Sequence, residues 1–148
     1  MILEFENLTK EKVNSDFFKE IAQITLEEAG LKKTDKTEIN LVLVEDEKIR
    51  ELNKKYRNQD KVTDVLSFTQ PDDFIQPPDQ INRLGEVFIC LSQAQKQSQD
   101  LKINVRQELA RLFIHGILHL MNYDHEEGSA AEVMRQLEEK ILKKVNTK

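Results

Sequence analysis

The sequence has 148 residues, of which 39% are hydrophobic and 33% are charged, and its net charge is −5. These values are typical of a water-soluble globular protein, so we expect a single domain over residues 1–148 and exclude wholesale disorder. No apolar stretch is long enough to span a membrane, and the N-terminus lacks the pattern of a signal peptide. With a single cysteine, no internal disulfide can form, and we therefore expect a cytoplasmic protein without a membrane partner.

In chain order, the first half of the sequence predicts helices and strands in alternation. Apolar residues at helical spacing predict helices over 15–29 and 46–57, and Gly30 is a natural stop for the first of them. Runs rich in β-branched residues predict strands. These strands cover residues 2–6, 39–44 and 65–68.

The middle of the chain contains all three prolines, within residues 69–83, and this composition predicts a surface loop. A further strand is predicted over residues 85–91. The polar stretch 92–100 that follows is predicted to be a helix, because Ser92 can cap its N-terminus.

The next predicted helix starts after Asn104, which forms a capping-box pattern with Gln107. It extends to about residue 121, where Asn122 can adopt the left-handed conformation that ends a helix. Residues 109–121 are apolar on nearly every side, so we expect a central, buried helix.

A last helix is predicted from the second capping-box pattern of the sequence, which Ser129 forms with Glu132. Four strands and about five helices in mixed order indicate an α+β fold, with a small mixed β-sheet packed against the helices. The sequence contains no internal repeat.

The three histidines, His115, His119 and His125, all lie within eleven residues. The first two are one helical turn apart and project from the same helix face, and the second gap lets the chain leave the helix and return. Three imidazoles at one zinc ion leave an open position, as catalytic zinc sites require. Three separate structural histidines are the alternative, but their clustering favours a metal site on the central helix.

The spacing also matches the metzincin peptidase motif His-Glu-x-x-His-x-x-Gly-x-x-His, so we expect a metzincin-like metal scaffold. The glutamate of that motif is the general base of the peptidases, and this chain has Gly116 there. Asn122 stands at the glycine of the turn and can adopt the same conformation. The sequence therefore keeps the metal scaffold and lacks the peptidase base.

Three segments resemble the signature of the YbeY family of bacterial endoribonucleases. They read HGxLHxxxYDH over 115–125, LNxxYRxxDxxTDVLSF over 52–68 and LGEVxI over 84–89. Their order and separation are similar to the family's, so the resemblance covers most of the chain. The chain departs from the family at Asn122, where glycine is usual, and at Val62 and Thr69, where proline is usual. These departures affect local geometry and no metal ligand.

The resemblance implies zinc-dependent cleavage of single-stranded RNA. It further implies a role in ribosomal RNA maturation, notably at the 3′ end of the small-subunit RNA, and in ribosome quality control. The partners implied are ribosomal RNA and the ribosome or its proteins, and no DNA. The zinc ligands implied are His115, His119 and His125, and the arginine implied to be functional is Arg57.

Arg57 lies in a local basic run, residues 48–61, where six basic residues oppose two acidic ones for a net +4. Such a run is most often a solvated helix face. A guanidinium, however, clamps phosphate oxygens through two parallel hydrogen bonds, which a lysine cannot reproduce. We therefore hypothesise that Arg57 binds the scissile or an adjacent phosphate.

The sequence does not identify the group that moves the proton in the cleavage reaction. Hydroxide on the metal is one candidate, and the RNA's own 2′-hydroxyl is another. Asp124 either orients a histidine or forms a turn. Glu108 is expected to be solvated or structural, and Cys90 to be a small core residue.

Two alternatives to a zinc nuclease remain at this point. One is a ribosome assembly factor with a structural metal, which open coordination disfavours. The other is a different metal-dependent hydrolase. Another divalent transition metal, such as nickel or copper, can also occupy three imidazoles.

Overall fold

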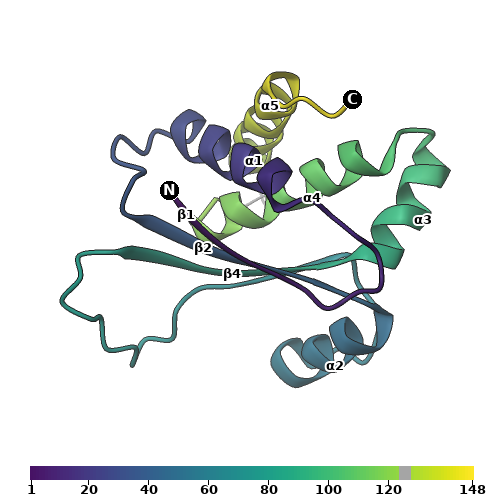
Figure 1. Ribbon diagram of the computed structural model, residues 1–148, viewed down its shortest axis with the longest axis horizontal. Helices are drawn as coiled ribbons and strands as arrows, with labels where there is room; N and C mark the ends of the chain where they lie inside the picture. The colour runs from purple at the N-terminus through teal and green to yellow at the C-terminus, as the bar shows by residue number, and fades with distance from the viewer. Residues whose placement is uncertain (124–127) are drawn as a thin grey trace.

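The computed structural model describes residues 1–123 and 128–148. Within them, the fold is α+β, with a mixed four-stranded sheet and five helices, as predicted (Figure 1). The elements are β1 (Ile2–Asn7), α1 (Ser15–Glu28), β2 (Thr37–Val44), α2 (Asp46–Arg57), β3 (Val65–Phe68), β4 (Asn82–Cys90), α3 (Leu91–Leu101), α4 (Val105–Leu120) and α5 (Gly128–Lys144). No helix among the described residues has both the length and the apolar character needed to cross a membrane.

The strands are ordered β1-β2-β4-β3 across the sheet. β1, β2 and β4 run parallel, and β3 pairs antiparallel to β4 at the other edge. A short segment, residues 58–64, joins α2 to β3, and the end of α2 lies beside the β3 edge, where Arg57 contacts Ser67. The same edge receives the second half of α4, which contacts both β3 and β4.

The two faces of the sheet bury different side chains, because successive residues of a strand point to opposite faces. Ile39, Leu41 and Leu43 of β2 face the larger core, together with side chains of α1, α4 and α5. Val42 and Val44 face a smaller cluster that α2 covers. Figure 1 shows α1, α4 and α5 on one side of the sheet and α2 on the other.

Helix α4 is the central helix of the larger core, and its second half is buried except at a few positions, as predicted. The capping box at its start is formed: the Asn104 side chain accepts from the Gln107 backbone, and the Gln107 side chain accepts from the Asn104 backbone. Asn122 follows the helix with a φ of 68°, the left-handed conformation that its sequence position predicted.

The predicted cap at Ser92 is wrong. Helix α3 begins one residue earlier, at Leu91, with Cys90 in the N-cap position. The Ser92 hydroxyl instead donates to a carboxylate oxygen of Asp46 at 2.6 Å. A charge-assisted bond to a partner 46 positions away in sequence therefore replaces the local cap.

The predicted cap at Ser129 is also wrong, because Ser129 lies inside α5, which the structure describes as Gly128–Lys144. Glu132, the expected partner in the capping box, accepts hydrogen bonds from Arg135 and Gln136 on the same helix.

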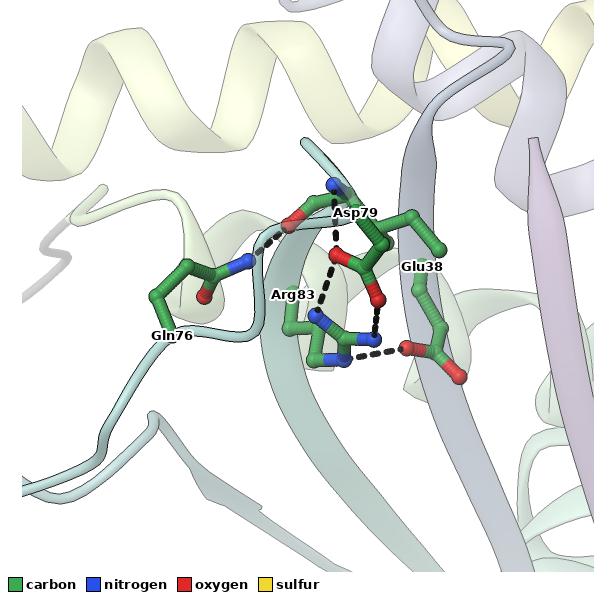
Figure 2. Close-up of polar contacts among 5 residues, drawn as sticks. Glu38, Gln76, Asp79 and Arg83 are labelled. Atoms are coloured by element: carbon green, nitrogen blue, oxygen red, sulfur yellow. Dashed lines mark hydrogen bonds and ion pairs between the residues drawn. The ribbon is translucent and has the colours of Figure 1, made fainter.

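Strand β4 begins at Asn82, three residues before the predicted start, so the loop before it ends sooner than expected. Arg83 explains the extension: its guanidinium pairs with Glu38 of the neighbouring β2 at 3.1 Å and with Asp79 of the loop at 2.5 Å (Figure 2). Arg83 lowers the pKa of Asp79 to about 2, so this carboxylate stays charged in all but strong acid. The pair joins the end of the loop to the sheet.

Candidate functional site

A cavity of about 450 Å³ opens where the end of α2, strand β3 and the last turns of α4 meet. It contains two of the three predicted metal ligands and the predicted phosphate-binding arginine. Its lining residues are Arg57, Val65, Leu66, Ser67, Phe68, Thr69, His115, His119 and Leu120. The site therefore combines the end of α2 and strand β3, which are close in sequence, with the distant helix α4.

His115 and His119 lie one turn apart on α4, and both rings face this cavity. Their ring centroids are 4.6 Å apart, and their Nε2 atoms approach to 3.1 Å. The predicted third ligand, His125, and its neighbour Asp124 lie outside the described residues. The three-histidine set consequently stays a prediction, although two of its members converge through the same ring nitrogen.

Glu138 of α5 contacts the His115 ring at Nδ1. Its carboxylate lies 2.8 Å from Nδ1 of the ring, and both side chains are largely buried. A carboxylate at this position accepts a hydrogen bond from Nδ1–H, and in that tautomer the lone pair is on Nε2, the atom that lies 3.1 Å from Nε2 of His119. This assigns to Glu138 the orienting role that the sequence suggested for Asp124, and no local pattern in the sequence marks Glu138.

The spacing of the two Nε2 atoms fits a shared metal ion. Zinc binds imidazole nitrogen at about 2.0–2.1 Å in tetrahedral geometry, which separates two ligand nitrogens by about 3.3–3.4 Å. The observed 3.1 Å between His115 and His119 is close to that separation.

Arg57 is the last residue of α2, and Asn58 ends the helix in the left-handed conformation with a φ of 57°. The guanidinium is positioned by two contacts. Its Nη2 donates to the Ser67 carbonyl oxygen at 2.7 Å, and its central carbon lies 4.8 Å from the centre of the Phe68 ring. Because a guanidinium has five N–H donors, further donors remain for a ligand in the cavity.

Gly116 lies between the two histidines, on the face of α4 that packs against the sheet. A Cβ atom at this position would lie 2.7 Å from Val87 Cγ1 and 3.1 Å from the Ser67 hydroxyl oxygen. The Ser67 hydroxyl also donates to the Gly116 carbonyl oxygen at 3.2 Å. The glycine thus permits the close approach of helix and sheet, and the space offers no room for the glutamate of a metallopeptidase.

Glu108 is fully buried. Of the two roles expected from the sequence, solvated or structural, it has the structural one. Arg111 donates to both of its carboxylate oxygens, at 2.7 and 2.6 Å, and Gln97 donates to one of them. The buried carboxylate raises the pKa of the Arg111 guanidinium. This set of bonds ties α3 to α4 and lies outside the cavity.

Cys90 is fully buried at the end of β4, as predicted. Burial raises the pKa of its thiol to about 11, so the sulfur stays protonated at neutral pH. Its sulfur contacts Asp46 and Ser92 and does not line the cavity of His115 and His119, so Cys90 is not placed to be a metal ligand there.

Comparisons with known proteins give the same family as the sequence motifs. The model of a family described as Endoribonuclease YbeY matches residues 4–146. A Dehalococcoides mccartyi protein named Endoribonuclease YbeY is 41% identical over 146 residues, covering 92% of this chain and 90% of the relative. One of the same name from Aquifex aeolicus is 39% identical, covering 94% and 89% respectively. The solution structure of a Thermotoga maritima protein is similar with a TM-score of 0.65 and 27% identity, over 97% of this chain and 89% of that chain.

Proposed function

The chain belongs to the endoribonuclease YbeY family, and from this membership we propose that it is a metal-dependent enzyme cleaving single-stranded RNA. Its proposed cellular role is ribosomal RNA maturation, notably at the 3′ end of the small-subunit RNA, and ribosome quality control, in the cytoplasm. The observation that carries the proposal is the cavity that holds two imidazole Nε2 atoms and a guanidinium together.

We propose His115, His119 and His125 as the ligands of one zinc ion, or of another divalent transition metal. The convergence of the first two rings and the orientation of His115 support this assignment. When bound, such an ion polarises a phosphoryl oxygen and lowers the pKa of a coordinated water. Three neutral ligands leave its positive charge uncompensated, which suits a polyanionic substrate.

The guanidinium of Arg57 binds the phosphate that is cleaved or one next to it. Cleavage builds negative charge on the phosphorus oxygens, and preorganised donors stabilise that charge at little reorganisation cost. The Ser67 carbonyl and the Phe68 ring supply this preorganisation. The Glu138 carboxylate has a different task, because it holds the Nδ1 proton of His115 and thereby fixes the ring orientation.

Changing Arg57 to lysine is expected to reduce RNA cleavage by about 10²–10³-fold, because one ammonium cannot make the two parallel bonds of a guanidinium. The cleavage rate of a labelled single-stranded RNA measures this effect. Arg50→Lys is the matched control, since Arg50 lies on the same helix and pairs with Asp60 outside the cavity. Full cleavage by Arg57→Lys would refute the phosphate-binding role.

Changing Glu138 to glutamine is expected to weaken zinc binding by about 10–100-fold, as loss of a partner behind a metal-bound histidine does. The amide oxygen of glutamine still accepts from Nδ1–H of His115, but a neutral acceptor makes a weaker bond and leaves Nε2 less basic. Zinc affinity can be measured by competition with a chromophoric chelator, and the melting temperature of the zinc-free protein reports folding. Glu139→Gln, the adjacent exposed position, should retain the affinity of the unaltered protein. Equal affinities for the two variants would contradict the role of Glu138.

A further inference from the structure

A second cavity, of about 460 Å³, lies on the sheet face that carries α2, between that helix and the loop after β3. Its apolar wall includes three aromatic side chains, from Tyr56, Phe68 and Phe88. The rings of Tyr56 and Phe68 are 5.3 Å apart, and those of Phe68 and Phe88 are 5.9 Å apart. Tyr56 is 54% exposed, so a flat ligand can reach its ring. The volume is within the range of small-molecule sites.

Two hydrogen-bond acceptors, the side chains of Asn40 and Glu86, line this cavity. Asn40 of β2 and Glu86 of β4 are paired across the parallel strands and face it together. The Asn40 side-chain oxygen is buried, and no hydrogen bond from the described part of the chain reaches it. Burial raises the pKa of the Glu86 carboxyl, and nearby Glu6 raises it further. A ligand that brings donors would relieve the poor solvation of both acceptors.

The second cavity adjoins the candidate functional site. Phe68 and Thr69 line both cavities. The consecutive residues Tyr56 and Arg57 line one cavity each, and both contact the Phe68 ring. A nucleotide with its phosphate at Arg57 therefore has an aromatic surface one side chain away.

We propose that this second cavity binds an unpaired guanine base of the RNA whose phosphate lies at Arg57. The inference rests on the proposed function and extends it to substrate selection. Single-stranded RNA is read by stacking its bases on aromatic side chains and by hydrogen bonds to their Watson–Crick edges. Guanine presents two adjacent donors on that edge, N1–H and the 2-amino group, which match the two oxygens of the Glu86 carboxylate. Adenine, cytosine and uracil each place an acceptor next to their donor, which the carboxylate repels.

The test compares three labelled uridine octamers that carry one central guanosine, inosine or adenosine. Binding is measured by fluorescence anisotropy in the presence of a chelator, so that no cleavage intervenes. Inosine lacks only the 2-amino donor, and we expect it to bind roughly tenfold more weakly than guanosine. Glu86→Gln is expected to remove most of this difference. Glu51→Gln, which changes the same charge at an exposed position of α2 outside the cavity, should preserve it.

Equal binding of the guanosine and inosine octamers by the unaltered protein would overturn the inference, as would a difference that survives in a folded Glu86→Gln variant. The comparison of octamers on the unaltered protein holds even if that variant fails to fold. Metal-restored cleavage of an all-uridine RNA tests the proposed function separately. Cleavage without guanine discrimination overturns only the base site, and discrimination without cleavage overturns only the nuclease.

Discussion

Replacing His119 with alanine is expected to remove bound zinc and to lower RNA cleavage by about 10³-fold or more, while the chain stays folded. The Nε2 atom of His119 is 3.1 Å from that of His115. Removing the His119 ring therefore removes one of the two proposed metal ligands that the structure describes. Stabilisation of developing charge by a metal ion is worth several kcal/mol, and each 1.36 kcal/mol corresponds to a factor of ten in rate. The side chain is only partly buried, and its removal should cost little stability.

The measurement combines zinc content per chain, by atomic absorption, with the cleavage rate of a labelled single-stranded RNA. Chelator-treated unaltered protein is the control, and it should match the variant in both quantities. A variant that loses zinc and yet cleaves at the normal rate would show that the metal is not used in the reaction.

Replacing Gly116 with alanine is expected to destabilise the fold by about 1–3 kcal/mol, the usual cost of an extra methyl group in a packed core. In most helices the same change stabilises, since glycine is about 1 kcal/mol worse than alanine there. The sign reverses here because the new Cβ would lie 2.7 Å from Val87 Cγ1. Chemical denaturation monitored by circular dichroism gives the free energy of unfolding.

A double variant isolates this contact. Val87→Ala removes both methyl groups that crowd position 116, so Gly116→Ala should cost much less stability in that background. The coupling energy between the two changes then reports the packing of α4 against β4. Equal costs of Gly116→Ala in both backgrounds would mean that the close helix–sheet approach does not explain the glycine.

Local chemistry made much of the fold predictable. The cap of α4 at Asn104, the left-handed Asn122 and the span of β3 follow from residues a few positions apart in sequence. The caps predicted at Ser92 and Ser129 follow the same local rules and are wrong. For Ser92 the competing partner, Asp46, is distant in sequence, and local patterns contain no information about it.

The candidate site was predictable to the extent that its residues are close in sequence. The helical spacing of His115 and His119 predicts two converging rings, and they converge. The resemblance to a known family, rather than any spacing, pointed to Arg57. Glu138 could not be predicted, because its contact with His115 depends on how α5 crosses α4. The packing role of Gly116 likewise required the sheet to be in place.

The most direct test of the central claim is metal-dependent cleavage of single-stranded RNA by the purified chain. The protein is freed of metal with a chelator, dialysed and mixed with labelled single-stranded RNA, with zinc added back in increasing amounts. We predict no cleavage without zinc and recovery that saturates near one zinc per chain. Cleavage that proceeds at full rate in the zinc-free protein, or RNA that stays intact at every zinc level, would contradict the account.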